Sequence, residues 1–92
     1  MVWPPSKELT DALLKVLLRH GGTGNVSVLD LEVSKEVKLS ETHLKIMRSG
    51  NRSEIQYRMA WIRTKAKQSG LIKKDSNKVW SITEKGRLLA GG

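Results

Sequence analysis

Hydrophobic residues at the start of the chain recur every three or four positions, which is the spacing of one face of a helix. The pattern predicts a helix from Ser6, its N-cap, to about His20. Residues 21–25 read Gly-Gly-Thr-Gly-Asn, a composition that is typical of a loop. The chain is therefore expected to begin with a helix that ends in a glycine-rich loop.

The hydrophobic positions that follow fit two structures, because they alternate as in a strand and also fall on one face of a helix. We predict the helix, over about residues 27–37. Ser40 is then expected to cap a short helical segment that carries Met47 and ends at residues 49–50.

The clearest amphipathic pattern lies in residues 53–69 and predicts a long helix. Ser53 and Gln56 have the spacing of a capping box, in which each side chain accepts a hydrogen bond from the other residue's backbone N–H. Four hydrophobic side chains form one narrow stripe that is expected to face the core: Ile55, Met59, Ile62 and Ala66. A separate, exposed face is predicted for Gln56, Ala60, Arg63, Thr64 and Lys67.

Two short runs that contain β-branched and aromatic residues flank Asp75-Ser76-Asn77 and predict a β-hairpin over residues 71–82. Gly70 is expected at the C′ position of the preceding helix, where a left-handed conformation is common. Thr83 is expected to cap a final short helix that ends at Leu89.

A chain of 92 residues is long enough for one small domain, with a core over about residues 6–90. It contains no cysteine, which excludes disulfides, thiolate zinc sites and a cysteine nucleophile. The hydrophobic run around Lys15 is far shorter than the roughly 20 residues of a membrane span. We therefore expect a soluble, cytoplasmic protein that does not contact a membrane.

The formal net charge is +8 at pH 7, and it is unevenly distributed. Residues 1–47 contain six Lys and Arg against six Asp and Glu, whereas residues 48–92 contain eleven against three. Such a one-sided basic surface indicates a polyanionic partner, although lysines can also serve only to keep a surface soluble.

The predicted order of elements is helix, helix, short helix, long basic helix, hairpin and closing helix. This order is typical of an α+β, mainly α, winged helix-turn-helix domain with a small β-hairpin wing. The most basic helix precedes the hairpin, where such folds place the recognition helix. A recognition helix must bury one stripe and present its other face to the major groove of double-stranded DNA, which explains why one helix carries both patterns.

The start of such a helix is expected to reach base edges, because Arg matches guanine and Asn or Gln matches adenine. The base-contact candidates are Asn51, Arg52, Ser53, Gln56, Tyr57 and Ala60. Other polar and basic side chains are expected to contact phosphates with release of counterions. The phosphate-contact candidates are Arg48, Arg63, Thr64, Lys67, Lys73, Lys74 and Lys78. Capping is an alternative role for Ser53 and Gln56, and packing in the core is an alternative role for Tyr57.

No arrangement of residues predicts catalysis, a metal site or a cofactor. His20 and His43 have no His, Cys or carboxylate at metal-ligand spacing, so each is expected to be a solvated surface residue. Glu36-Val37-Lys38 matches half of a PD-(D/E)xK nuclease motif. Asp30 is too close to it, on the same predicted helix, to complete a metal site.

Three segments, Arg58–Thr64, Ser69–Ile72 and Val79–Arg87, resemble the N-terminal winged-helix domain of Mrr-like restriction endonucleases, which are modification-dependent, type IV enzymes. That family has an Arg, apolar, small, Trp segment in its long helix and an Ile-Thr-x-x-Gly segment that closes its wing. Ser49-Gly50 also matches a Ser-Gly pair in the family. The chain departs from the usual family residues at Met59 and in its strongly basic wing.

The resemblance implies a DNA-recognition domain whose nuclease domain, of the PD-(D/E)xK class, lies in another part of the same polypeptide. It also implies recognition of methylated bases, for which Tyr57 or Ala60 is the candidate apolar contact. Trp61 occupies a signature position of the family and is expected to pack against a neighbouring element, as are Trp80 and Trp3.

The residues themselves leave two other functions open. One is a free-standing transcriptional regulator, and the other is a winged helix that binds an acidic protein or RNA. Salt dependence separates the last of these from duplex binding, because phosphate contacts make the affinity for DNA fall steeply with salt.

Overall fold

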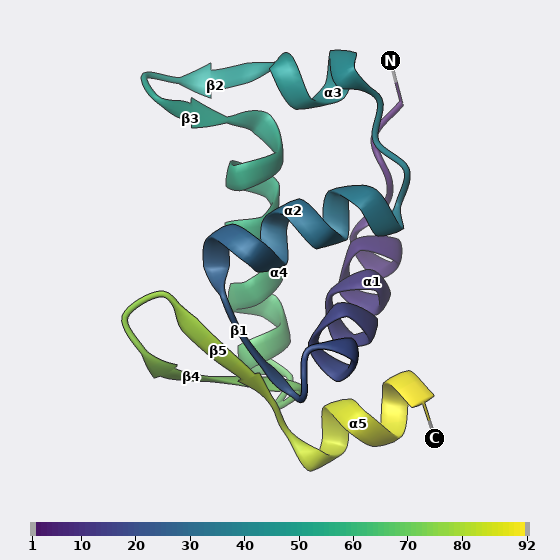
Figure 1. The fold of residues 1–92 in the computed structure, drawn as a ribbon. Coiled ribbons are helices and arrows are strands. Elements are labelled where there is room, and N and C mark those ends of the chain that lie inside the picture. The colour runs from purple at the N-terminus through teal and green to yellow at the C-terminus, as the bar shows by residue number, and fades with distance from the viewer. Residues whose placement is uncertain (1, 92) are drawn as a thin grey trace.

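The computed structural model describes residues 2–91, and Figure 1 shows how their helices and strands are arranged. In chain order the elements are α1 (Ser6–Arg19), β1 (Thr23–Asn25), α2 (Val26–Glu36), α3 (Glu41–Lys45), β2 (Met47–Ser49), β3 (Arg52–Ser53), α4 (Glu54–Gln68), β4 (Ile72–Ser76), β5 (Val79–Ile82) and α5 (Glu84–Gly91). The fold is α+β, mainly α and winged-helix-like, which confirms the predicted class.

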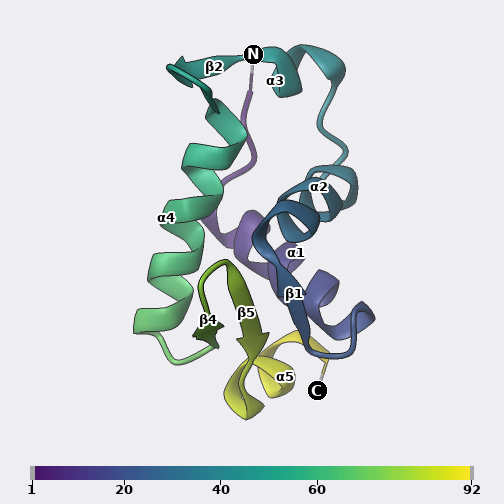
Figure 2. The ribbon, with the colours of Figure 1, turned by 60° about the vertical axis from the view of Figure 1, so that its left-hand side comes forward.

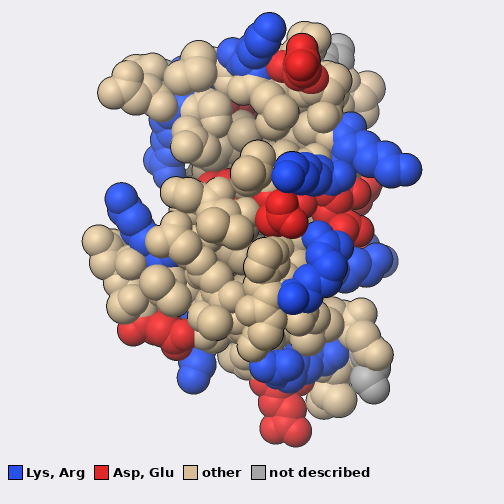
Figure 3. Space-filling model, viewed as in Figure 1, with Lys and Arg blue, Asp and Glu red and all other residues tan. Residues whose placement is uncertain are grey.

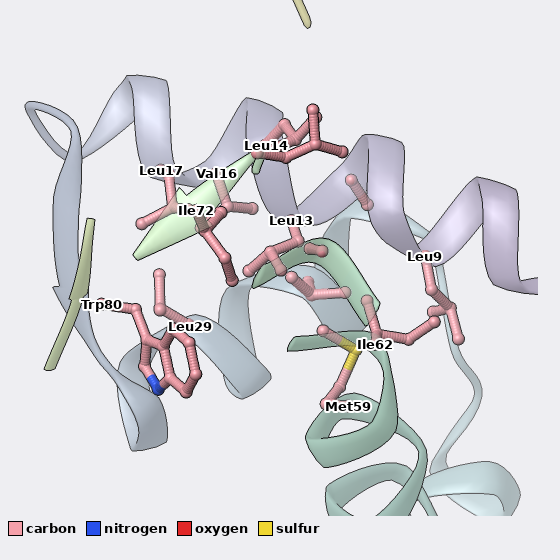
Figure 4. Close-up of a cluster of buried hydrophobic side chains, with 14 of the residues drawn as sticks. Leu9, Leu13, Leu14, Val16, Leu17, Leu29, Met59, Ile62, Ile72 and Trp80 are labelled. Carbon is pink, nitrogen blue, oxygen red and sulfur yellow. The ribbon is translucent and has the colours of Figure 1, made fainter. Parts of the chain in front are cut away.

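The core is built around α1, which contacts α2, α4, α5 and the sheet. Leu13 and Leu17 of α1 are completely buried, and side chains from the neighbouring elements close around them (Figure 4). Trp80 of β5 lies beside Leu29 of α2 and is buried, which confirms that this tryptophan packs in the interior (Figure 4). Burial of these side chains is the main favourable term in the stability of such a fold.

The larger sheet has the strand order β1-β5-β4 and is antiparallel. Its edge strand β1 falls in residues 21–25, so the prediction of a loop throughout this segment is wrong. Thr23 pairs with Ser81 and Asn25 with Val79, which are more than fifty positions away along the chain. The strand forms because this distant partner offers hydrogen bonds, and the local composition carries no sign of that pairing.

The first two helices have the predicted positions, but the N-cap of the first differs from the prediction. Pro5, not Ser6, is the N-cap of α1, and it makes no capping hydrogen bond with a side chain. Asn25 caps α2 by accepting a hydrogen bond from the N–H of Ser27 at 2.9 Å. The choice of helix over strand for this region is confirmed, and Leu31, which a strand would place on the same face as the buried Leu29, is 54% exposed.

The segment between α2 and α4 differs most from the prediction. Ser40 caps α3 as expected, and the ring of His43 completes the capping box. The helix then ends at Lys45, and Met47–Ser49 is a strand, so the prediction of a helical segment that extends to residues 49–50 is wrong. This strand pairs with Arg52–Ser53 around a turn at Gly50, whose φ of +50° favours glycine.

The long helix α4 begins and ends as the sequence predicts. The N–H of Ser53 donates to Gln56 Oε1 at 2.9 Å, and the N–H of Gln56 donates to Ser53 Oγ at 3.2 Å. At the other end Gly70 has φ of +78°, and the N–H of Leu71 donates to the carbonyl of Ala66 at 2.9 Å, which completes a Schellman motif. The predicted stripe of Ile55, Met59, Ile62 and Ala66 is buried.

The wing and the last helix follow α4 directly. Strands β4 and β5 form the predicted hairpin, and the N–H of Gly86 donates to Thr83 Oγ1 at 3.1 Å, as expected for a cap. The helix continues to Gly91, beyond the predicted end at Leu89.

Gly86 packs so closely on the wing that a larger residue should not fit. A Cβ at this position would overlap the carbonyl oxygen of Leu71 and come within 2.7 Å of Ile82 Cγ1. We expect Gly86→Ala to lower the free energy of unfolding by about 2 kcal/mol, as measured by urea denaturation. Gly91→Ala is the control, because a Cβ there would meet only Leu18 Cδ1 at 3.5 Å. Equal stability of the two variants would contradict this packing.

Candidate nucleic-acid interface

The surface with the most functional candidates is the outer face of α4 and the two hairpins next to it. The β2–β3 hairpin leads into the first residue of α4, and β4 contacts α4 at its other end (Figures 1 and 2). In Figure 2 the β4–β5 wing lies beside the lower part of α4. The structure therefore brings the predicted recognition helix and the predicted wing to one side of the molecule.

A shallow hollow of about 300 Å³ lies on the outer face of α4. Its lining comprises Arg52, Tyr57, Ala60, Trp61 and Thr64. The four helical residues have the spacing i, i+3, i+4 and i+7, so they form a second stripe beside the buried one. Three base-contact candidates and one phosphate-contact candidate thus share a single site.

Trp61 of this site is more exposed than the sequence predicts. We predicted that it packs against a neighbouring element, but 53% of its surface is exposed. A large aromatic side chain left in solvent, next to Tyr57, is available to a partner of the protein.

Ser53 and Gln56 are occupied with each other in the capping box, so the alternative role that we considered for them is realised. The side chain of Gln56 remains exposed. It borders a second hollow of about 370 Å³ whose lining comprises Val26, Asp30, Asn51, Arg52, Gln56 and Arg63. Arg52 therefore lies between the two hollows, at the start of α4.

Arg63 does not lie on the exposed face. It is 6% exposed, and its Nη1 lies 2.5 Å from Oδ1 of Asp30 on α2, so its assignment as an exposed phosphate contact is corrected. The helical angle places Arg63 away from the hydrophobic stripe, but α2 covers that flank of α4. Burial raises the pKa of the Asp30 carboxyl above its ordinary value, while the guanidinium groups of Arg63 and Arg52 act in the opposite direction.

Arg48 lies on β2 and is held against the start of α4. Its Nη1 is 3.3 Å from Glu54 Oε1, and its guanidinium carbon is 3.9 Å from the centre of the Tyr57 ring. Arg58 binds the other oxygen of Glu54 at 2.7 Å and lies over the Trp3 ring. Arg48 and Arg58 therefore orient the hairpin, Tyr57 and the N-terminal segment, and their charge is partly compensated by Glu54.

The wing lysines are exposed and free of carboxylate partners. Within residues 2–91, no ion pair involves Lys67, Lys73, Lys74 or Lys78. In Figure 3, several Lys and Arg side chains and one acidic group lie near the hairpins on the left, whereas acidic and basic groups alternate over α1 and α2 on the right. The ion pairs of Arg19 and Lys35 with Glu32 and Glu36 account for much of that alternation.

The two histidines differ in their contacts with the rest of the protein. His43 is not the solvated surface residue that we predicted, because its Nε2 lies 2.8 Å from the carbonyl oxygen of Val2 and its ring contacts Trp3 edge to face. His20 is exposed and lies 3.8 Å from a carboxylate oxygen of Glu32.

The described residues contain no group of three or more His, Cys, Asp or Glu that could hold a metal ion. They also contain no helix that is long and apolar enough to cross a membrane.

Comparison with known proteins supports the resemblance seen in the sequence. The family model described as the Mrr N-terminal domain matches residues 7–90, which is nearly the whole chain. Neither the curated proteins nor the solved structures include a significant match.

Proposed function

We propose that this chain, which belongs to the Mrr N-terminal domain family, is the DNA-binding module of a restriction endonuclease. In this proposal it recognises double-stranded DNA that carries methylated bases, through α4 and the β4–β5 wing. The nuclease domain lies in another part of the same polypeptide. The observation that carries the proposal is the hollow on the exposed face of α4, whose lining combines Arg52 with the aromatic side chains of Tyr57 and Trp61.

The start of α4 reads base edges in the major groove, which is about 12 Å wide and admits a helix. The guanidinium of Arg52 is exposed and in no ion pair among the described residues. It is therefore free to donate two hydrogen bonds to the O6 and N7 atoms of guanine. Gln56 is the exposed amide side chain beside Arg52, and an amide matches adenine. Ser53 acts only as the N-cap that stabilises the start of the helix.

A base methyl group enters the hollow between the aromatic rings. Tyr57, Ala60 and Trp61 offer apolar surface there, and a methyl group on a base is recognised in the major groove by apolar contact. Because Arg48 stacks on Tyr57, the tyrosine ring has a fixed position before DNA arrives. The site is therefore suited to a base that carries an extra methyl group beside a guanine or adenine.

Phosphates are bound at the edges of this site. Lys67 and Thr64 lie on the exposed side of α4, and Lys73, Lys74 and Lys78 lie on the wing. Each lysine that neutralises a phosphate releases counterions, so these contacts supply affinity that does not depend on sequence. Arg48 contributes less, since Glu54 partly compensates its charge.

Fluorescence anisotropy tests the proposal with one duplex in three forms: unmodified, with 5-methylcytosine and with N6-methyladenine. We expect one modified form to bind at least tenfold more tightly, which is about 1.4 kcal/mol. Trp61→Ala should remove that preference, whereas Leu88→Ala, an exposed leucine on α5, should keep it. Equal affinity for all three duplexes would exclude a modification reader, and absence of duplex binding would favour a protein partner.

A further inference from the structure

The connection between α2 and α4 is longer than a helix-turn-helix requires. Such motifs join their two helices through a turn of about three or four residues. Here residues 37–53 intervene and contain α3 and the β2–β3 hairpin. Connections that are positioned by a rigid scaffold carry binding residues more often than the elements they join.

The β2–β3 hairpin and the β4–β5 wing project from the same side of the molecule, one at each end of α4 (Figure 1). The helix has 15 residues, which corresponds to a length of about 22 Å. The major groove is about 12 Å wide and is bordered by one phosphate backbone on each side. The ends of α4 are therefore farther apart than the groove is wide, so arms at the two ends can reach both borders when the helix crosses the groove.

The hairpin is held rigidly on α4. The N–H of Glu54 donates to the carbonyl of Ile46 at 2.8 Å, which joins the base of the hairpin to the first residue of the helix. Arg48 adds its contacts with Glu54 and with the Tyr57 ring. An arm whose direction is fixed in this way loses little conformational entropy when it binds.

The tip of the hairpin is open and suited to a phosphate backbone. Gly50, Asn51 and Arg52 are exposed, and a Cβ built on Gly50 would meet no other atom within 4 Å. Residues 46–53 contain two arginines and no acidic residue. Asparagine side chains and backbone N–H groups are common donors to phosphate oxygens.

We propose that the β2–β3 hairpin is a second DNA-binding arm, which contacts the phosphate backbone on the border of the groove opposite to the β4–β5 wing. The tip at Gly50-Asn51 approaches the backbone, while Arg52 faces the hollow on α4. This inference rests on the proposed function, since it requires that α4 lies in a major groove.

Tethered DNA cleavage tests the second arm, because the chain contains no cysteine and a single introduced thiol can carry an iron chelate. The probes are placed at Asn51→Cys in the tip of the β2–β3 hairpin and at Asn77→Cys in the tip of the wing. The control is Asp11→Cys on α1, which lies away from both hairpins (Figure 1). Each labelled protein is mixed with an unmodified duplex of about four helical turns, roughly 40 base pairs.

We expect the Asn51→Cys and Asn77→Cys probes to cut the duplex with comparable yield, and the Asp11→Cys probe to cut at least tenfold less. Cutting by the Asn77→Cys probe alone would overturn the second arm and leave the proposed function intact. Equal cutting by all three probes would also overturn it, because binding would then have no fixed orientation. If neither hairpin probe cuts and anisotropy shows no binding of the unlabelled protein, the proposed function itself fails.

Discussion

Arg63→Ala is expected to lower the free energy of unfolding by roughly 3–5 kcal/mol, because it leaves the Asp30 carboxylate buried without its partner. A domain of this size has a total stability of only about 5–15 kcal/mol, so the loss would be a large part of it. Urea denaturation monitored by circular dichroism measures the change. The ion pair also joins α2 to α4, so the same variant is expected to lose the fixed orientation of α4.

A double variant separates the burial of charge from the shape of the site. Asp30→Leu combined with Arg63→Met removes both charges and keeps most of the volume, and such replacements of buried ion pairs are often neutral or stabilising. We expect the double variant to lie within about 1 kcal/mol of the native protein. A loss below about 1 kcal/mol for Arg63→Ala alone would mean that the pair is solvated, contrary to the structure.

Replacing the three wing lysines, Lys73, Lys74 and Lys78, by glutamine is expected to weaken duplex binding about 100-fold near 0.1 M salt. Each lost phosphate contact reduces the slope of log affinity against log salt by about 0.9, so the slope should become less steep by nearly three units. Anisotropy titrations over a series of salt concentrations measure both quantities.

The control for the wing variant removes the same number of charges elsewhere. Lys7, Lys15 and Lys38 are exposed on α1 and at the end of α2, away from the wing. Their replacement by glutamine should change the affinity by less than about threefold, through the long-range field alone. If the two triple variants lost affinity equally, the wing would have no specific role in DNA binding.

Features of α4 that depend on neighbouring residues could be predicted from the sequence. The capping box of Ser53 and Gln56, the C-terminal glycine Gly70 and the buried stripe all require only spacing along one helix. The strands β1, β2 and β3 could not be predicted, because each is only two or three residues long and depends on a partner strand for its hydrogen bonds.

Arg63 and Trp61 were both misassigned, but helical geometry is insufficient only for Arg63. Arg63 lies outside the hydrophobic stripe, and only the position of α2 reveals that its flank of α4 is covered. Trp61 also lies outside that stripe, and its exposure agrees with its helical angle. The spacing of Tyr57, Ala60, Trp61 and Thr64 was a signal in the sequence that would have found the hollow.

The most direct test of the proposed DNA interface is amide chemical-shift mapping of the labelled chain during titration with a duplex. The proposed interface predicts that the largest shifts lie in residues 50–64 and 73–79, which form the β2–β3 hairpin tip, the start of α4 and the wing. Amides on the outer faces of α1 and α5 should be unchanged. If the largest shifts lay on α1 or α5, or if no amide shifted at saturating duplex, the proposed DNA interface would be wrong.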